Sequence, residues 1–97
     1  MGKPKSSGGK MRASHILVPK HGQLLKIIDE LDAGKKFKDL AREFSECPSK
    51  KKGGDLGYFP RGKMAPEFER AVLKLKVGDI SEPVKTQFGW HLIKRTG

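Results

Sequence analysis

The sequence predicts an α+β domain, with strands near both ends of the chain and helices between them. Residues 11–18 have the character of a strand, and two further strand-like segments lie near the end, at residues 83–85 and 90–95. Between them, three segments carry apolar residues at helical spacing. A short strand candidate before the third helix completes the expected order, β-α-α-β-α-β-β.

The first strand candidate, residues 11–18, is largely apolar on both faces. Successive side chains of a strand point to opposite faces, so Ala13, His15 and Leu17 share one of them. Two apolar faces are typical of a strand in the middle of a sheet. We therefore expect this strand to have neighbours on both sides.

Three segments then repeat one helical pattern, with apolar residues at positions i, i+3, i+4 and i+7. Each pattern makes one apolar stripe, which a sheet or another helix has to cover. Gly34 separates the first two helices, Pro66 suits the first turn of the third, and Gly78 suits the exit after it. The stripes are Leu24, Ile27, Ile28 and Leu31; Phe37, Leu40, Ala41 and Phe44; and Phe68, Ala71, Val72 and Leu75.

The remaining segments are short. Residues 47–54, with the sequence CPSKKKGG, are expected to form a loop, and residues 55–59 the second strand. A turn around residues 87–89 joins the last two strands. Residues 1–10 lack the apolar segment of a secretion signal and are rich in Gly, Ser and Lys. We expect them to be a flexible basic tail before a single domain at residues 11–97.

Composition excludes several classes of protein. The 97 residues have a net charge of +10, from 21 Lys and Arg against 11 Asp and Glu. No apolar run approaches the ~20 residues that cross a membrane. The single cysteine excludes an internal disulfide framework and a multi-cysteine zinc site, so the reducing cytoplasm is the expected compartment.

The histidines and the cysteine are the residues most able to carry chemistry. His15 and His91 lie in predicted strands beside apolar neighbours. Each is a core histidine or, if the two strands are neighbours, one half of a pair. His21 falls in a loop-like stretch, where we expect it to be solvated. Cys47 begins a lysine-rich segment and is either a buried structural cysteine or an accessible thiol.

Other interpretations of these residues fit less well. A cysteine protease would pair Cys47 with a histidine, but no protease signature surrounds it. No Cys or His pair has zinc-finger spacing, so no metal and no other cofactor are expected. GGDLG at residues 53–57 lacks the phosphate-binding patterns and suits a tight turn. Met64 and Phe88 lie outside the helical stripes and could line a binding pocket.

Four motifs along the chain resemble those of the parvulins, a family of peptidyl-prolyl cis/trans isomerases. They are SHILV at residues 14–18, SECPS at residues 45–49, GGDLGYFPRGKMAPEF at residues 53–68 and TQFGWHLI at residues 86–93. They occur in the family's order and spacing, and the resemblance covers about residues 12–96. It implies the FKBP-like parvulin fold, in which helices surround a four-stranded antiparallel sheet.

The resemblance also implies which residues form the site. His15 and His91 match the paired histidines at its centre, and Thr86 matches a hydroxyl that joins their hydrogen bonds. Cys47 matches a position that holds Cys in some members and Asp in others. The substrate proline would bind against a set of apolar side chains, namely Leu56, Met64 and Phe68, with Phe88 at the rim of the pocket.

Two features differ from the phosphate-directed parvulins. Those proteins carry a longer, Arg-rich loop after the first strand, whereas residues 19–23 are short and hold Lys20 but no arginine. We also expect no WW domain, because only the ten-residue tail precedes the first strand. The resemblance is therefore to a small, single-domain, monomeric parvulin, similar to the stand-alone prokaryotic members, that needs no phosphate on its proline-containing polypeptide substrates.

The expected mechanism forms no covalent bond. Rotation of an amide is slow, with a barrier of ~18–20 kcal/mol, because twisting breaks its resonance. The planar amide oxygen carries more partial negative charge than the twisted one, so an apolar pocket favours the twisted state. We expect the histidine network to orient Thr86 and Cys47, and Cys47 to tune the electrostatics at the carbonyl without attacking it.

Two lysine clusters raise the question of an anionic partner. They are either a solvated surface or a loose anchor for anionic membrane lipids or acidic clients. Few aromatic residues accompany them, which argues against nucleic acid. A lysine anchor would place the protein at the inner surface of the membrane. The clusters consist of Lys35, Lys36, Lys38, Lys50, Lys51 and Lys52.

Two alternative functions use the same features. A chaperone-like module would hold unfolded, proline-containing chains in the pocket without turning them over. A basic nucleic-acid-binding protein would bind with a steep dependence on salt. Rate acceleration at substoichiometric protein separates an isomerase from both.

Overall fold

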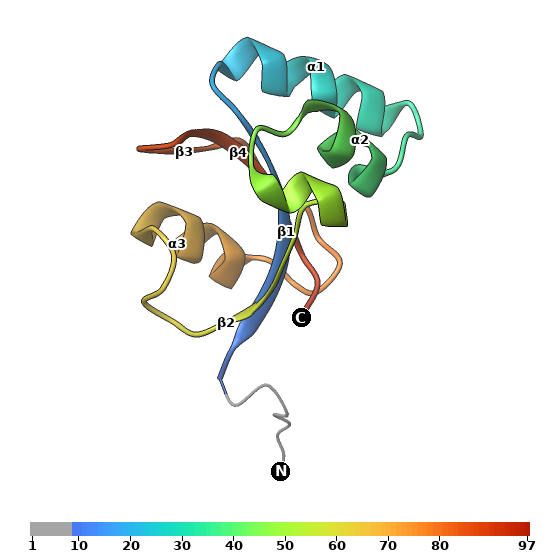
Figure 1. Ribbon diagram of the computed structural model, residues 1–97. Coiled ribbons are helices and arrows are strands. Elements are labelled where there is room, and N and C mark those ends of the chain that lie inside the picture. Colours follow the sequence, from blue (N-terminus) through green and yellow to red (C-terminus); the bar gives the residue numbers. More distant parts are fainter. Residues whose placement is uncertain (1–8) are drawn as a thin grey trace.

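The computed structural model describes residues 9–97 and confirms the α+β fold and its order of elements (Figure 1). The tail predicted at residues 1–10 falls mainly on residues 1–8, outside the described residues. One 3-10 helix, η1, is added to the expected elements. The elements are β1 (Met11–Val18), α1 (His21–Asp32), α2 (Phe37–Phe44), η1 (Pro48–Lys52), β2 (Asp55–Phe59), α3 (Pro66–Lys74), β3 (Val84–Thr86) and β4 (Gly89–Arg95).

The four strands form one antiparallel sheet in the order β2-β1-β4-β3. β1 lies between two neighbours, as its two apolar faces predict. In the register of β1 and β4, His15 lies opposite Ile93, and Leu17 opposite His91. The two histidines are therefore diagonal neighbours on one face of the sheet, close enough for their rings to meet.

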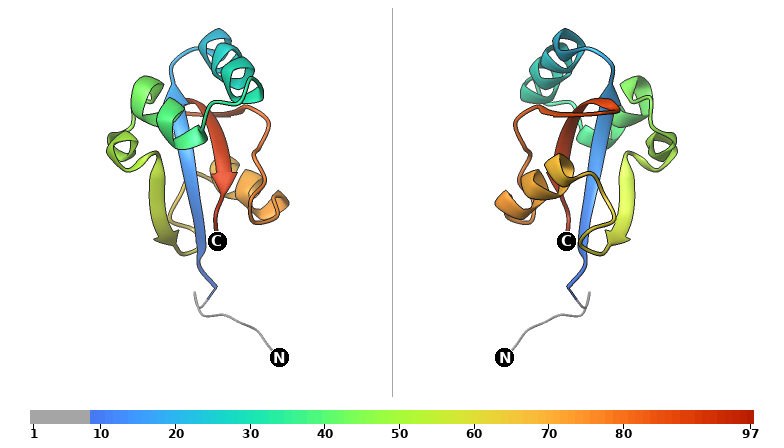
Figure 2. Two further views of the ribbon diagram at one scale, coloured as in Figure 1. Left: turned by 90° about the vertical axis from the view of Figure 1, so that its right-hand side faces the viewer. Right: turned by 90° about the vertical axis from the view of Figure 1, so that its left-hand side faces the viewer.

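Helices cover both faces of the sheet and give two hydrophobic cores (Figures 1 and 2). On one face, α1 and α2 pack their stripes against Ile16, Val18 and Leu92. On the other face, α3 packs against Ala13 and Ile93. Since side chains alternate along a strand, His15 and His91 point to the α3 face. The site thus lies in the layer between the sheet and α3.

Three local expectations were wrong in detail. Residues 47–54 are not all loop, because Pro48 begins η1 and Gly53, in the left-handed conformation, ends it. The strands expected at residues 83–85 and 90–95 are β3 and β4, whose bounds differ from the expected ones by one residue. His21 begins α1 instead of lying in a loop; it is exposed, as predicted, and its ring lies 4.4 Å from that of Trp90.

Gly54 brings the chain after η1 close against β1. Its φ is +89°, and a Cβ there would lie 2.5 Å from the His15 carbonyl oxygen and 3.2 Å from the Ala41 Cβ. The Gly54 carbonyl accepts a hydrogen bond of 3.0 Å from the His15 N–H. The glycines of the GGDLG motif therefore form a tight turn into β2, as predicted, and this turn fixes the backbone of His15.

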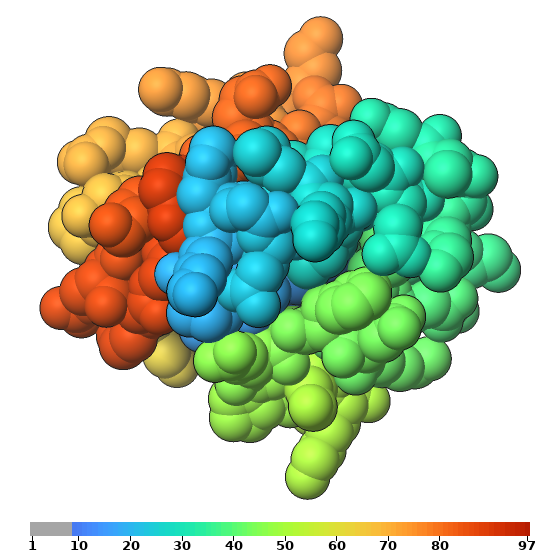
Figure 3. Space-filling model, turned by 90° about the horizontal axis from the view of Figure 1, so that it is seen from above, coloured from blue at the N-terminus to red at the C-terminus, as the bar shows by residue number. Residues whose placement is uncertain are grey.

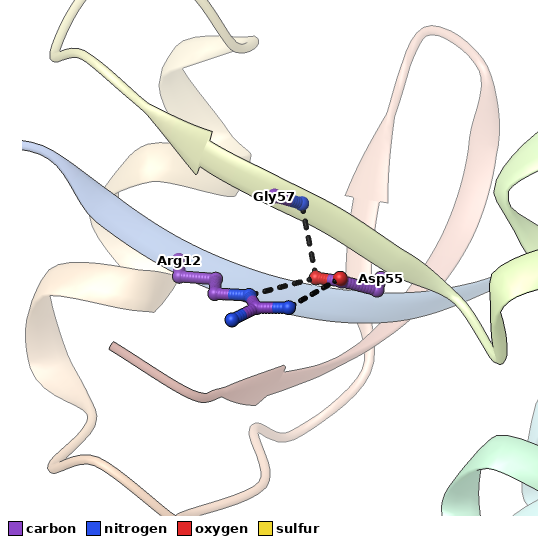
Figure 4. A network of polar contacts seen from close by, with 3 residues as sticks. All are labelled: Arg12, Asp55 and Gly57. Atoms are coloured by element: carbon purple, nitrogen blue, oxygen red, sulfur yellow. Dashed lines mark hydrogen bonds and ion pairs between the residues drawn. The ribbon is translucent and has the colours of Figure 1, made fainter.

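A second clamp joins β2 to the start of β1 (Figure 4). Arg12 donates to both carboxylate oxygens of Asp55, at 3.1 and 2.6 Å, and the Gly57 N–H donates to the same carboxylate at 2.9 Å. The Arg12 hydrogen bond holds the pKa of Asp55 below its usual value. The clamp positions β2, which carries Leu56 to the site.

Candidate active site

The centre of the site is a pair of buried histidines. His15 on β1 and His91 on β4 are 5% and 4% exposed, and their Nδ1 atoms lie 2.9 Å apart. A neutral imidazole has one N–H and one acceptor nitrogen, so one ring must donate in this hydrogen bond and the other must accept. The tautomers of the two histidines are therefore coupled.

Thr86 on β3 extends this pair into a chain of three buried side chains. Its Oγ1 lies 2.7 Å from the His91 Nε2, and it accepts a hydrogen bond of 3.1 Å from the Phe88 N–H. The tight turn that returns from β3 to β4 depends on Gly89, whose φ is +135°, because a Cβ there would lie 2.8 Å from the Val18 carbonyl oxygen. The chain Thr86–His91–His15 thus links three strands.

The chain has two neutral arrangements, which differ in the direction of every hydrogen bond. If Thr86 donates to His91 Nε2, then His91 Nδ1 donates to His15 and leaves an N–H at His15 Nε2. If His91 Nε2 donates to Thr86, the His15 Nε2 carries a lone pair. In the described part of the chain, that nitrogen is buried and has no hydrogen-bond partner. Hence the direction of the hydrogen bond at the Thr86 hydroxyl decides whether the His15 Nε2 carries a hydrogen or a lone pair.

Both histidines are neutral near pH 7. Burial, which is the larger cause, and the nearby His91 together lower the pKa of His15 to about 4. Burial also lowers the pKa of His91 to about 4. The pair is therefore suited to hydrogen bonding within a fixed network, and not to proton donation as an imidazolium.

Phe68 of α3 keeps water away from the pair. Its ring packs edge-on against His15 and His91, with centroid distances of 5.6 and 5.4 Å. Phe59 of β2 supports it from behind at 6.2 Å. These contacts explain why burial dominates the pKa shifts of the histidines.

A cavity of about 340 Å³ opens beside the histidines. Phe88 is 65% exposed and stands at its mouth, where the resemblance placed it. The structure brings every predicted catalytic and substrate-binding residue to this one cavity, which is lined by His15, Cys47, Leu56, Met64, Phe68, Thr86, Phe88 and His91.

Cys47 lines the cavity and is half-buried, so it is not the buried structural cysteine of one interpretation. The expectation that the histidine network orients it is not supported: within residues 9–97, no hydrogen bond joins its thiol to either ring. Its backbone N–H donates instead to the Ser45 Oγ at 3.3 Å, and that hydroxyl also accepts from the Leu17 N–H at 3.0 Å. The cysteine is positioned through the backbone, by a buried serine.

Four lining residues were not singled out from the sequence: Leu17, Glu46, Pro48 and Ala65. Leu17 shares a strand face with His15, and the alternation of side chains along the strand already predicted that they lie on the same side. Glu46 and Pro48 flank Cys47 in the SECPS motif, and Ala65 follows Met64. The sequence offered one indication that these three residues line the site, namely that each is adjacent to a predicted site residue.

The lysine clusters lie elsewhere. None of the six lysines lines the cavity; they lie around the start of α2 and along η1, which is in contact with α2. Lys35 is engaged by Glu30 at 2.6 Å, and this bond raises its pKa. Within the described residues, no three His, Cys, Asp or Glu side chains are placed to hold a metal ion, and no helix has the length and apolar character to cross a membrane.

The family model described as "Rotamase: PPIC-type PPIASE domain" matches residues 15–97 of the chain. The match includes both histidines, Cys47 and all the apolar residues of the cavity. The chain belongs to this family. The family is one of peptidyl-prolyl cis-trans isomerases, so the match confirms the parvulin resemblance and the prediction of an isomerase domain.

Among curated relatives, the PPIC-type domain is 54% identical to "Foldase protein PrsA 1" of Bacillus cereus over 88 residues, which are 90% of this chain and 31% of the relative. It is 51% identical to "Foldase protein PrsA" of Bacillus subtilis over 89 residues, or 91% of this chain and 30% of that protein. The chain therefore spans about a third of the length of these relatives.

Solved structures show the same fold. A crystal structure of PrsA from Bacillus anthracis matches with a TM-score of 0.88 and 50% identity, over 91% of this chain and 41% of the other. NmPin, the parvulin of Nitrosopumilus maritimus, matches with a TM-score of 0.82 and 48% identity, over 98% of this chain and 100% of its own. The Pin protein of Cenarchaeum symbiosum gives 0.81 and 50%, over 99% and 100%.

Proposed function

We propose that this PPIC-type domain accelerates rotation about Xaa-Pro bonds in unfolded or flexible polypeptide segments, without a requirement for phosphate. The observation that carries the proposal is the apolar cavity of about 340 Å³, which ends at a buried, neutral histidine pair. A proline ring and its neighbouring amide fit a space of this size and character. We propose that the domain works as a monomer.

The proposed mechanism stabilises the twisted amide without forming a bond to it. Leu56, Met64 and Phe68 hold the proline ring, while the water-poor surroundings disfavour the charge on a planar amide oxygen. Each 1.36 kcal/mol by which the site prefers the twisted form gives about a tenfold gain in rate. Because the barrier is only lowered and no intermediate is needed, neither a cofactor nor a nucleophile is required.

The charges around the cavity support a substrate without phosphate. Of the described residues that line it, none is Lys or Arg, and Glu46 carries a negative charge. Phosphate recognition relies on cationic side chains, above all on arginine. A doubly negative phosphate beside the proline would therefore meet a carboxylate and no counter-charge.

Cys47 offers the sharpest test of the non-covalent mechanism. We expect Cys47→Asp to keep at least about a tenth of the wild-type rate, a loss of about 1.4 kcal/mol or less. A carboxylate can tune the field at the substrate carbonyl but is a poor substitute for an attacking thiol. The measurement is exchange spectroscopy on a proline peptide, with Cys47→Ala as the matched control and thermal unfolding to verify folding. Complete loss in a folded Cys47→Asp variant would favour nucleophilic attack.

We further propose that the lysines around α2 and η1 hold the domain loosely on anionic lipid headgroups, which would place it at the inner surface of the cytoplasmic membrane. The supporting observation is that Lys50, Lys51 and Lys52 follow one another along η1, with no acidic partner within 4.0 Å among residues 9–97. The segments of α2 and η1 lie side by side, and Figure 3 shows them in green and yellow-green on one face of the molecule. Near an anionic surface, each basic residue contributes about 1 kcal/mol. Acidic client proteins are the alternative partner.

Co-sedimentation with vesicles tests this proposal. At low salt, we expect the domain to pellet with vesicles that contain anionic lipid and to stay in solution with neutral ones. Replacing Lys50, Lys51 and Lys52 by Gln should weaken the binding, whereas the same exchange at Lys35, which Glu30 already engages, should have less effect. Equal sedimentation with both kinds of vesicle would remove the membrane proposal.

A further inference from the structure

One negative charge stands at the cavity of a strongly basic protein. The chain has a net charge of +10. Among the described residues that line the cavity, however, Glu46 is the one charged residue, and it is acidic. The side chain is exposed, and no Lys, Arg or His side chain of residues 9–97 lies within 4.0 Å of its carboxylate. The carboxylate is thus free to meet a charge on a substrate.

The backbone of Glu46 is fixed to the strand that carries the active-site histidine. Its N–H donates to the Leu17 carbonyl at 2.8 Å, and the neighbouring Ser45 Oγ accepts from the Leu17 N–H at 3.0 Å. Ser45 is itself buried, so this short segment cannot move independently of β1. Because Leu17 follows His15 by two residues, these bonds hold the backbone of Glu46 beside the strand of His15, and Glu46 lines the cavity that opens there.

We infer that Glu46 selects substrates by charge: it favours a Lys or Arg next to the proline and disfavours Asp, Glu or a phosphorylated residue there. The inference rests on the proposed isomerase function and names its substrate class. A substrate side chain that flanks the proline would leave the apolar cavity toward solvent, and Glu46 is both exposed and part of the cavity lining. There, a cation gains an ion pair and an anion is repelled.

The sign of the preference separates this local effect from the field of the whole protein. A net charge of +10 attracts acidic peptides and raises their rate of encounter. Glu46 acts in the opposite direction and only on residues beside the proline. An exposed ion pair is worth a factor of about two to five, and added salt weakens it because the Debye length is about 8–10 Å near physiological ionic strength.

The test uses unphosphorylated peptides that differ only in the residue before or after the proline, which is Ala, Lys or Glu. We expect the wild type to show a kcat/KM for the best Lys peptide about two to five times that for the Ala peptide, and a lower value for the matching Glu peptide. In Glu46→Gln the ratio of Lys to Ala should fall to about one or below, because only the field of the positive protein remains, and Glu46→Lys should reverse the order. Salt of about 1 M should reduce the wild-type ratio as well.

Glu43→Gln is the matched control. It removes the same charge three residues away on the exposed side of α2, at a position that does not line the cavity, and should leave the preference unchanged. A wild-type enzyme that turns over the three peptides equally, or the Glu peptide best, would overturn the inference. So would a Glu46→Gln variant that slows all peptides by the same factor, since Glu46 would then act on the reaction and not on substrate charge. Failure to turn over even the Ala peptide would instead refute the isomerase function, and the inference with it.

Discussion

Replacing Thr86 by Val tests whether the hydroxyl at the end of the histidine chain holds the site together. Valine has nearly the same shape as threonine but has a methyl group in place of Oγ1. The change removes the contact of 2.7 Å with the His91 Nε2 and the hydrogen bond of 3.1 Å from the Phe88 N–H. It leaves Gly89, on which the turn from β3 to β4 depends, unchanged.

The expected loss of stability follows from these two contacts. Each net hydrogen bond contributes about 0.5–1.5 kcal/mol, and a buried nitrogen left without a partner costs about 1–3 kcal/mol. His91 is 4% exposed and Thr86 5%, so water has little access to the nitrogen that the hydroxyl would leave. Because the new methyl group recovers part of the loss through burial, we expect a net decrease of about 2 kcal/mol in the free energy of unfolding. In a domain of this size, that decrease lowers the Tm by roughly 8–16 °C.

The same variant should change the histidine tautomers. Without the hydroxyl, nothing at the His91 Nε2 fixes the direction of the bond to His15. The ¹⁵N shifts of the imidazole rings should then report a mixture of tautomers, and kcat/KM should fall about tenfold, or about 1.4 kcal/mol in the rotational barrier. Thr96→Val is the matched control: Thr96 is exposed, and we expect wild-type stability and rate.

The reasoning fails if Thr86→Val unfolds within about 0.5 kcal/mol of the wild type and keeps wild-type ¹⁵N shifts on both rings. Such a result would show that Phe68 and the sheet, and not the hydroxyl, determine the histidine geometry. A stable variant with mixed tautomers but an undiminished rate would separate the network from catalysis.

Two further predictions concern pH and the turn before β2. The pKa of both His15 and His91 is about 4 in the folded protein, below the ordinary 6.5 of the unfolded chain, so the unfolded chain binds more protons between these values. The free energy of unfolding should therefore be highest above pH 6.5 and decrease as the pH falls toward 4; urea titrations across this range check it, and a constant value would contradict a neutral pair. Gly54→Ala should destabilise by at least about 2 kcal/mol, because a Cβ would lie 2.5 Å from the His15 carbonyl oxygen at a φ of +89°. Gly22→Ala, on open α1 surface, should be neutral or slightly stabilising in the same thermal unfolding assay, and similar behaviour of the two variants would refute the argument.

The spacing of apolar residues predicted the helices and strands well, because nearly every element of this small domain buries one face in a hydrophobic core. Strand β1 matches its expected residues, since both of its faces enter a core. The apolar stripe of the third helix extends one residue beyond α3, because Leu75 still packs in the core after the helix has ended at Lys74. The spacing of apolar residues shows which side chains are buried, and a side chain can be buried although its residue lies beyond the end of the helix.

The site was predictable only in part from the residues themselves. The pairing of His15 with His91 depends on β1 lying next to β4, which no local pattern reveals, and the resemblance supplied it. The hydrogen bonds that position Cys47 join Ser45 to Leu17, which are far apart in the sequence, and were missed. Glu46 has no cationic partner within 4.0 Å among residues 9–97, and this too depends on tertiary structure that no local pattern reveals.

The most direct test of the account is exchange spectroscopy on an unphosphorylated Leu-Pro peptide, with the protein present in catalytic amount. Uncatalysed exchange takes tens to hundreds of seconds, so cross-peaks between the cis and trans forms are absent without an enzyme. We predict that they appear when the protein is added at a small fraction of the peptide concentration. If exchange stays at the uncatalysed rate while the peptide binds, the cavity serves to hold proline segments, and the proposed stabilisation of the twisted amide is contradicted.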